Sequence, residues 1–327
     1  PLRLDIAMGF LQQNKLHTIT RYIEELQFFK DLPDNPLKLY NVSEVDIGLA
    51  TLDKLAQQVM RYSTNLDVDF IPFSLLETLL EEFVDNLREI LGPLEHLSLV
   101  TVITENMGIR IHQSVRDSCQ AYGQWNAGAD MSEVALLNRL VEALCEVMPW
   151  VDTSPSAYWE ASRLYAPHVS QVLAKATDVL GPHPDVASLL ELMGNYQERI
   201  ACNYRQALAY FETVYKMRRK LYGGEPHFNI AKSLKNVGVM ISEKLGKTQE
   251  GLPYLKRALT MRQKLYGETP HPDVADSLND LGVAYQKLGE LQKSLPYLEQ
   301  ALAMRQELYG EVPRPDVARS LNDVGRG

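Results

Sequence analysis

An internal repeat in the second half of the chain is the sequence feature that most constrains its fold. Leu221-Tyr222-Gly223 recurs as Leu265-Tyr266-Gly267 and again as Leu308-Tyr309-Gly310, at spacings of 44 and 43 residues. Two further markers keep the same register: residues 234–238, 278–282 and 321–325, and residues 184–187, 272–275 and 315–318. Three independent markers in one register indicate that this half is built from repeated structural units.

Each unit is expected to contain two helices. In the clearest unit, residues 272–312, Asp273 follows a proline and is expected to cap the first helix. Apolar residues then follow at helical spacing: Leu278, Leu281 and Tyr285. Gly289 is expected to end that helix. Gly282 and Ala301 are small enough to let the two helices approach closely.

This pattern resembles the tetratricopeptide repeat, in the long form found in kinesin light chains. The resemblance covers residues 183–327, as three units and part of a fourth, and it implies an α-solenoid of stacked helix pairs. The first unit departs from the family at Gln197 and Val214, where a tyrosine and an alanine are usual. Because Gly327 falls part-way through a first helix, we expect the natural protein to continue beyond it.

In arrays of this family, the first helix of each unit lines the concave face, so the resemblance implies a binding surface there. By register, the residues on that face are Lys232, Lys235, Val239, Asp276, Asn279, Val283, Gln286, Arg319 and Asn322. Exposed Asn and Lys side chains can hydrogen-bond an extended peptide or pair with its acidic groups. We therefore expect a protein or peptide ligand. The alternatives are a solvated face, or one that contacts other domains of the same protein.

The first half of the chain is expected to contain helices and a small hairpin. Helical patterns cover residues 1–31 and continue from 46 to Met60, and a connection at residues 67–72 leads to a helix over residues 73–91. Residues 97–111 are rich in β-branched residues around an Asn-Met-Gly turn, which predicts a β-hairpin. Helices before a hairpin, with another helix after it, form a winged-helix arrangement. The predicted fold class is mostly all-α.

Several segments of this half resemble NB-ARC signalling ATPases of the STAND type. Pro1-Leu2-Arg3-Leu4 resembles the GLPLAL segment of that family. The resemblance to the winged-helix domain of that family lies in residues 69–72, 98–100 and 109–115. The resemblance to the segment that joins such a domain to a repeat array lies in Trp159 and residues 164–169. His112 matches the family, whereas Gln113 and Ser114 depart from it. The implied domains are a helical remnant of the NB-ARC module, a winged helix, a helical joint and the repeats, at residues 1–44, 45–128, 129–182 and 183–327.

The resemblance implies nucleotide contacts for two residues in the full-length protein. A histidine at the place of His112 contacts the β-phosphate of ADP in that family, and an imidazole N–H can donate to a phosphate oxygen. Pro1 stands where the family packs a proline on adenine. The alternative is that His112 packs at the end of a hairpin strand. ADP or ATP with Mg²⁺ is accordingly the cofactor expected of the full-length protein.

Within this chain we expect no catalytic residues, no metal site and no bound cofactor, so it is not expected to be an enzyme. Gly246-Lys247-Thr248 imitates the end of a P-loop, but Ile241 stands where a glycine is needed. The histidines lack metal-ligand spacing, and His168 is expected to pack or cap. Cys119, Cys145 and Cys202 are too scattered for a disulfide framework or a zinc site.

Charge and hydropathy limit the partners. The first 150 residues are acidic, the remainder is nearly neutral, and the formal net charge is −9. A chain without a broad basic face is not expected to bind nucleic acid. Its apolar runs are far shorter than the roughly 20 residues that cross a bilayer. It shows no signal-peptide pattern, so we expect a cytoplasmic protein without membrane contacts.

Two functions follow from the resemblances. In the first, the chain is the sensor portion of a nucleotide-switched signalling ATPase, of the kind that acts in innate immunity or cell death. Its repeats would bind a ligand, contact the protein's own nucleotide-binding domain and control oligomerisation. In the alternative, it is a kinesin-light-chain-like adaptor or scaffold that binds short cargo peptides without a nucleotide switch.

Overall fold

The computed structural model describes residues 54–81, 84–97, 99–105, 107–122, 132–149, 155–310, 312 and 314–326. The chain divides into two compact units, Pro1–Gly181 and Pro182–Gly327. Pro1 and the helical segment predicted for residues 1–44 lie outside the described residues. Across the described part of the chain, no helix is long and apolar enough to span a membrane.

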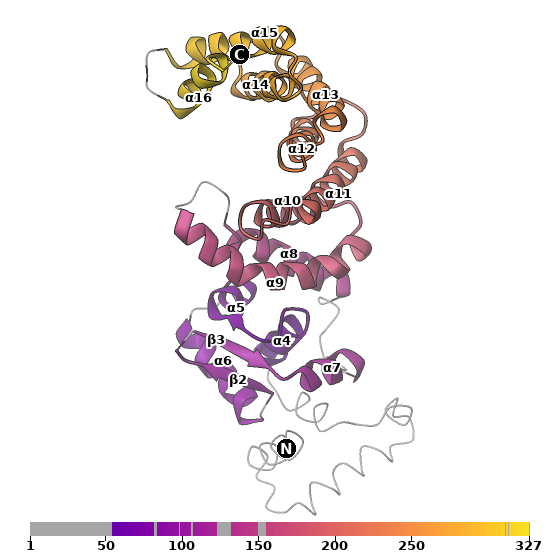
Figure 1. The fold of residues 1–327 in the computed structure, drawn as a ribbon. Coiled ribbons are helices and arrows are strands. Elements are labelled where there is room, and N and C mark those ends of the chain that lie inside the picture. The colour runs from indigo at the N-terminus through magenta and orange to yellow at the C-terminus, as the bar shows by residue number, and fades with distance from the viewer. Residues whose placement is uncertain are drawn as a thin grey trace, which may run out of the picture. The chain divides into compact units, whose positions relative to one another are not determined.

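The first unit is mostly helical and contains a small antiparallel sheet (Figure 1). Its described elements are α4 (Lys54–Ser63), β1 (Ile71–Pro72), α5 (Phe73–Leu80), α6 (Val84–His96), β2 (Val100–Ile103), β3 (Gly108–Ile111), α7 (Gln113–Tyr122), α8 (Glu133–Val147) and α9 (Pro155–Val179). The strand order is β1-β3-β2, with Val100 opposite Ile111 and Ile71 opposite Ile109. The predicted hairpin is confirmed. The segment at 67–72, which we expected to be a connection, adds a strand to it.

The core of the first unit lies where α5, α6 and the sheet meet. Leu75, Leu91 and Ile109 are each at most 1% exposed. A Cβ on Gly108 would lie 2.5 Å from the ring of Phe70, so the close approach of β3 to this segment requires a glycine. Burial of these aliphatic side chains is the main favourable term that holds the unit together.

The single helix predicted over residues 73–91 is wrong, because the structure has two helices there. α5 ends at Leu80, and Glu81 takes a left-handed conformation with φ 60°. Arg139 of α8 donates to the carbonyls of Leu79 at 3.3 Å and Thr78 at 2.5 Å. These are carbonyls that the end of a helix leaves unpaired. A side chain far along the sequence therefore stabilises the break.

The second unit consists of stacked helix pairs, as predicted (Figure 1). Its elements are α10 (Pro184–Arg199), α11 (Tyr204–Tyr222), α12 (Phe228–Val239), the π-helix η2 (Met240–Lys244), α13 (Thr248–Tyr266), α14 (Pro272–Lys287), α15 (Leu291–Tyr309) and α16 (Pro315–Val324). α10 packs on α11, α12 on α13 and α14 on α15, and α16 is the first helix of a further unit. We call α10, α12, α14 and α16 the first helices, and α11, α13 and α15 the second helices.

Glycines allow the two helices of each unit to approach closely. A Cβ on Gly282 would lie 2.5 Å from Leu298 of the paired helix, which confirms the predicted close contact at this residue. The same register position is Gly238 against Leu255 and Gly194 against Phe211, at 2.7 and 2.5 Å. An alanine at any of these glycines would push the helix pair apart or force the large side chain to move.

The difference between the 44- and 43-residue spacings has a structural cause. Gly238 and Gly246 are separated by one residue more than Gly282 and Gly289. The extra residue lies in the first helix of its unit, where Met240–Lys244 widens into a π-helix. A π-bulge of this kind absorbs one inserted residue without breaking the helix. The helix pairs on either side therefore keep their register.

The first helices are capped by histidines, not by the aspartate that we predicted. In α14 the N-cap is His271, whose Nδ1 accepts from the N–H of Asp273 at 3.1 Å. His227 and His183 cap α12 and α10 in the same way. The N-cap side chain satisfies an N–H that would otherwise lack a partner. In the last unit Arg314 stands at this position and makes no side-chain cap.

Candidate interaction surface of the repeats

The predicted binding residues all lie on first helices, as the register required. Lys232, Lys235 and Val239 are in α12, and Arg319 and Asn322 are in α16. The others are in α14: Asp276, Asn279, Val283 and Gln286. With the residues that contact them from neighbouring first helices, they form what we call the first-helix face.

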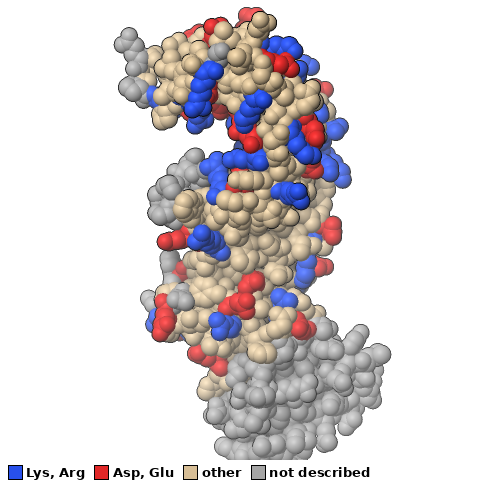
Figure 2. Space-filling model, in the orientation of Figure 1, with Lys and Arg blue, Asp and Glu red and all other residues tan. Residues whose placement is uncertain are grey.

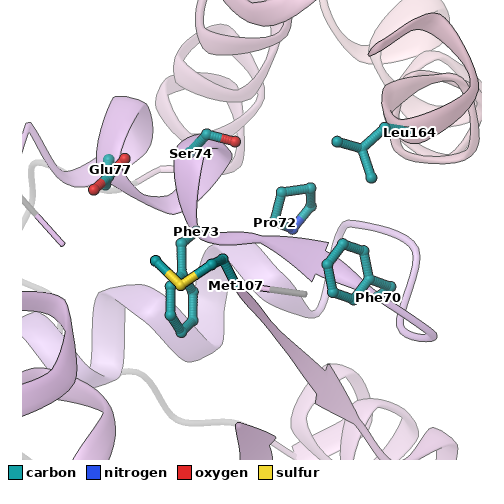
Figure 3. Close-up of a pocket in the computed structure, with 7 residues that line it drawn as sticks. All are labelled: Phe70, Pro72, Phe73, Ser74, Glu77, Met107 and Leu164. Atoms are coloured by element: carbon teal, nitrogen blue, oxygen red, sulfur yellow. The ribbon is translucent and has the colours of Figure 1, made fainter. Parts of the chain in front are cut away.

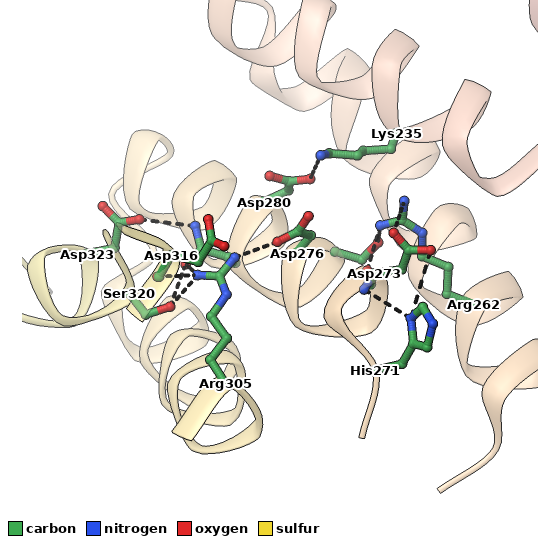
Figure 4. Close-up of polar contacts among 12 residues, drawn as sticks. Lys235, Arg262, His271, Asp273, Asp276, Asp280, Arg305, Asp316, Ser320 and Asp323 are labelled. Carbon is green, nitrogen blue, oxygen red and sulfur yellow. Dashed lines mark hydrogen bonds and ion pairs between the residues drawn. The ribbon is translucent and has the colours of Figure 1, made fainter. Parts of the chain in front are cut away.

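Polar pairs connect successive first helices across this face. The carboxylate of Glu191 accepts from Asn236 at 3.0 Å, and Asn279 donates to Asp323 at 3.0 Å. Between them, the Lys235 ammonium lies 3.7 Å from the carboxylate of Asp280 (Figure 4). Each pair joins the same two register positions of adjacent units. We call these pairs the inter-repeat ladder.

The ladder corrects the prediction that Asn279 is exposed. Its side chain is 5% exposed, because it lies between α15 and α16. Its amide donates to Asp323, and its oxygen is 3.5 Å from the guanidinium of Arg305. A buried amide with both ends engaged stabilises the stack and is closed to a ligand. Asn322, at the same register in α16, is exposed.

The first pair of the inter-repeat ladder contains a buried carboxylate, that of Glu191, which has several donors around it. Glu191 is 1% exposed, and its oxygens lie 2.8 Å from Arg218 and 3.1 Å from Lys232. Burial acts to raise the pKa of Glu191, but the charges of Arg218 and Lys232 outweigh it and hold that pKa below its usual value. Lys232, which we predicted as a ligand contact, is therefore also a structural partner.

Arginines buried in the second helices connect each repeat to the first helix of the next repeat. Arg218, Arg262 and Arg305 are spaced by 44 and 43 residues and are at most 4% exposed. Each donates to a serine in the following first helix, in turn Ser233, Ser277 and Ser320. Each also donates to a carbonyl in the first turn of that helix, in turn that of Asn229, Asp273 and Asp316. Figure 4 shows Arg262 and Arg305.

These arginines were not among the predicted residues, although the sequence contains a signal for them. A Met-Arg pair recurs at 217–218, 261–262 and 304–305, inside a stripe that is otherwise apolar. A charged residue repeated at a core position is unusual unless it is paired. Arg305 is paired with Asp276 at 2.6 Å. Asp276, which we predicted as a ligand contact, is therefore also a structural partner.

The second repeat, which consists of α12, η2 and α13, differs from the neighbouring repeats at two positions of the first-helix face. The positions that hold Asp276 and Asn279 in α14 hold Lys232 and Lys235 in α12. Arg262 consequently finds its carboxylate in the following helix, at Asp273, 3.5 Å away. The lysine side chains keep 41% and 28% of their surface exposed. This stretch of the face is therefore cationic.

Next to these lysines, Asp280 carries an unsatisfied carboxylate oxygen. Its Oδ2 is buried and forms no hydrogen bond among the described residues. Burial raises the pKa of Asp280 to about 6, against the opposing charge of Lys235. The nearby carboxylates of Asp276 and Glu243 add to that rise. The Lys235–Asp280 pair is thus weaker at neutral pH than an ordinary ion pair.

His112 lies at the start of α7, directly after β3. Its side chain is exposed. Its backbone carbonyl accepts from the N–H groups of Val115 at 2.9 Å and Arg116 at 3.1 Å, the first turn of the helix. Because the imidazole is exposed, it adds little core volume, and this exposure does not favour the packing alternative. The contact with ADP stays a prediction.

The histidine that was expected to pack or cap does so. His168 of α9 is 1% exposed, and its Nδ1 accepts from the N–H of Asp67 at 3.1 Å. Burial lowers the pKa of His168 to about 4, because the charged imidazole is disfavoured away from water. Throughout the described ranges, no cluster of His, Cys, Asp or Glu is suited to a metal ion.

An open pocket of about 590 Å³ lies in the first unit beside the hairpin (Figure 3). It is lined by Phe70, Pro72, Phe73, Ser74, Glu77, Met107 and Leu164. The lining is mostly apolar, and Glu77 supplies its carboxylate. These side chains include no nucleophile–base pair of the kind that covalent catalysis uses.

Comparison with known proteins identifies the repeats. A tetratricopeptide-repeat family model matches residues 226–307. The chain therefore contains tetratricopeptide repeats, as predicted. A comparison with curated proteins gives no match.

Three solved structures illustrate what the fold is similar to. A putative kinesin light chain of Podosopora anserina is 15% identical, with 80% of this chain and 100% of that chain covered and a TM-score of 0.43. BtubC from P. vanneervenii is 17% identical, with 80% and 95% covered and a TM-score of 0.40. A signal transduction ATPase with numerous domains and a tetratricopeptide repeat sensor, from Pyrococcus horikoshii, is 13% identical, with 97% and 55% covered and a TM-score of 0.35.

Proposed function

We propose that the repeats bind a protein or peptide segment along the first-helix face. Tetratricopeptide repeats generally bind such partners. The observation that carries the proposal is that Val239 and Val283 are both half-buried and stand at the same register of successive first helices. They lie on α12 and α14, the two helices that the Lys235–Asp280 pair connects.

The physical basis is preorganisation. Ordering a free, rotamer-rich side chain at an interface costs about 0.5–1.5 kcal/mol. Lys232 and Lys235 are already held by carboxylates, so less of this cost remains when they contact a ligand. The valines offer apolar contact between the lysines of α12 and the exposed Arg319 and Asn322 of α16. We expect an extended segment with apolar side chains and at least one carboxylate opposite α12.

The test is partner capture, with the melting temperature of each variant measured beside it, because Val239 also packs against the core of the repeats. Val239→Ser with Val283→Ser removes the half-buried apolar contacts of the face and should weaken binding at least tenfold. The matched control is Val179→Ser, because Val179 is an exposed valine at the end of α9. Equal binding by the double variant and by the control would place the interface elsewhere.

For the whole protein, we propose a nucleotide-switched signalling ATPase of the STAND type. In support, helices α4, α5 and α6 precede the β2–β3 hairpin and α7 follows it, which is the winged-helix arrangement expected from the sequence. The exposed side chain of His112, directly after β3, is also compatible with contact to a nucleotide in another domain. In this proposal the repeats hold the switch closed until a ligand binds.

A single variant tests the switch. In the full-length protein, His112→Ala should release ADP about ten- to a hundredfold faster, since a charge-assisted hydrogen bond contributes roughly 1.5–3 kcal/mol. The melting temperature should change little, because the side chain is exposed. An unchanged ADP off-rate would leave the adaptor alternative, in which partner binding does not respond to nucleotide.

A further inference from the structure

A second open pocket, of about 390 Å³, lies in the second unit between the turn after α11 and the helix α13. The turn contributes residues 224–226, including Glu225. α13 contributes Lys256, Arg257, Thr260 and Lys264, which share one side of the helix. The residues that form the first-helix face do not line it. Figure 2 shows Lys and Arg side chains distributed over the repeats, with Asp and Glu side chains among them.

The charges of this pocket are not neutralised. Lys256, Arg257 and Lys264 are exposed, and within the described residues none of these cations forms an ion pair with a carboxylate. Glu225 is the acidic residue among the lining residues. The lysines of the first-helix face, in contrast, each have a carboxylate within 4 Å. The pocket therefore keeps a positive potential that an anionic group would satisfy.

The repeat itself shows that these cations are not needed for the fold. At the same register, α15 carries Glu299, Gln300 and Glu307 in place of Lys256, Arg257 and Lys264. α11 carries Glu212, Thr213 and Lys220 there. Since the same helix packs equally well with acidic residues at these positions, the basic cluster is a particular property of α13.

Arg257 is held in place for binding. Its guanidinium donates to the hydroxyl of Tyr215 at 2.7 Å and lies 5.7 Å from the centre of that ring. Tyr215 is 9% exposed in α11, so it forms a rigid support. A guanidinium has five N–H donors, so most of its donors remain for a ligand. The hydroxyl of Thr260 lies one turn further along α13.

We propose that this pocket binds a phosphoryl group carried by a peptide, as in a phosphorylated serine or threonine of a partner. Three cations against one carboxylate suit the double negative charge of such a group, and Arg, Lys and Thr are donors that phosphate oxygens accept. The pocket is larger than one phosphoryl group. It therefore has room for the side chain next to the phosphorylated residue, which would lie on Met261.

Fluorescence anisotropy on the full chain tests the proposal. The probe is a labelled Gly/Ser peptide that contains one phosphoserine followed by leucine, and it is compared with the same peptide carrying serine or glutamate. We expect the phosphopeptide to bind at least tenfold more tightly than either. Inorganic phosphate should compete, and the affinity should fall as salt is raised, because exposed charges are screened.

Two variants locate the site. Lys256→Glu with Arg257→Gln and Lys264→Glu copies the residues of α15, so the helix should fold, and it should weaken phosphopeptide binding at least tenfold. The control, Arg205→Gln with Lys287→Glu and Lys293→Glu, lowers the net charge by the same amount at other exposed positions and should bind normally. If the first variant fails to fold, Arg257→Gln alone should still weaken binding severalfold.

Several outcomes would overturn the proposal. Equal affinity for the serine and phosphoserine peptides would show that no phosphoryl site is present. Equal affinity for the glutamate peptide would indicate a general carboxylate site. Equal loss in both variants would reduce the effect to net charge. Binding of phosphoinositide vesicles, but not of the peptide, through the same residues would assign the pocket to a membrane surface. Each result is independent of the valine variants that test the first-helix face.

Discussion

The imidazole of His271 stacks on the ring of Tyr266, with ring centres 3.5 Å apart and planes 8° from parallel. The same imidazole caps α14 through its Nδ1. Tyr222 and His227 repeat the arrangement one unit earlier, at 3.7 Å and 6°. The recurring tyrosine of the Leu-Tyr-Gly marker and the histidine after it thus form one structural element, which joins each second helix to the next first helix.

This element predicts the effect of removing the histidine. His271→Ala loses both the N-cap acceptor and the ring contact, so it should lower the free energy of unfolding by about 1–2 kcal/mol. Chemical denaturation measures the change. His96→Ala is the control, since His96 is exposed at the end of α6 and should change stability by under about 0.5 kcal/mol. Equal losses would mean that the cap contributes nothing.

Cys202 predicts a stabilising substitution. It occupies the turn position taken by Gly246 and Gly289 in the later units, and its φ of 51° lies in the same left-handed region as their 69° and 74°. A residue with a Cβ pays about 1–2 kcal/mol there. Cys202→Gly should therefore raise the melting temperature by a few degrees. Cys202→Ala keeps the Cβ and should give no such gain, and a gain with alanine would refute the strain argument.

Local sequence patterns predicted the helix pairs, the glycine contacts and the hairpin, because each depends on residues that are close in sequence or fixed by the repeat. The break after α5 was not predictable in this way. It depends on Arg139, which reaches the carbonyls of Thr78 and Leu79 from another helix. Glu81, at the break, is not a residue type that normally signals a helix end.

The binding face shows the same limit. Periodicity correctly placed Asn279 on a first helix, but its burial depends on α15 and on Asp323 in α16, which no single-helix pattern contains. The inserted residue at η2 was signalled by the 44-residue spacing, yet its form as a π-helix depends on keeping both neighbouring helix pairs in register.

Asp280 predicts how stability changes with pH. The pKa of this carboxyl is raised to about 6, above its ordinary value of 3.8, so the folded state binds a proton that the unfolded state releases. The resulting stability is present below pH 3.8 and is lost as pH rises through about 6. Asp280→Asn should therefore stabilise the protein at pH 7 by about 1–2 kcal/mol.

The control for this change lies within the repeat. Asn236 already stands at the register of Asp280, so an asparagine fits this place in a first helix. Unfolding curves from pH 4 to 7.5 should show the difference between Asp280→Asn and the parent growing with pH. A difference that does not vary with pH would mean that Asp280 does not titrate in this range.

Asn279 and Asn322 occupy one register position in two surroundings, and they separate structure from binding. Asn279 is 5% exposed and engaged with Asp323 and Arg305, so Asn279→Ala removes buried hydrogen bonds from the stack and should cost about 1–3 kcal/mol. Asn322 is exposed, and Asn322→Ala should change stability by less than about 0.5 kcal/mol. Thermal melts measure both changes.

If the first-helix face binds a ligand at α16, Asn322→Ala should weaken partner capture without a change in melting temperature. A stable Asn279→Ala protein would show that the ladder is not a source of stability, whereas unchanged capture by Asn322→Ala would confine the interface to α12 and α14.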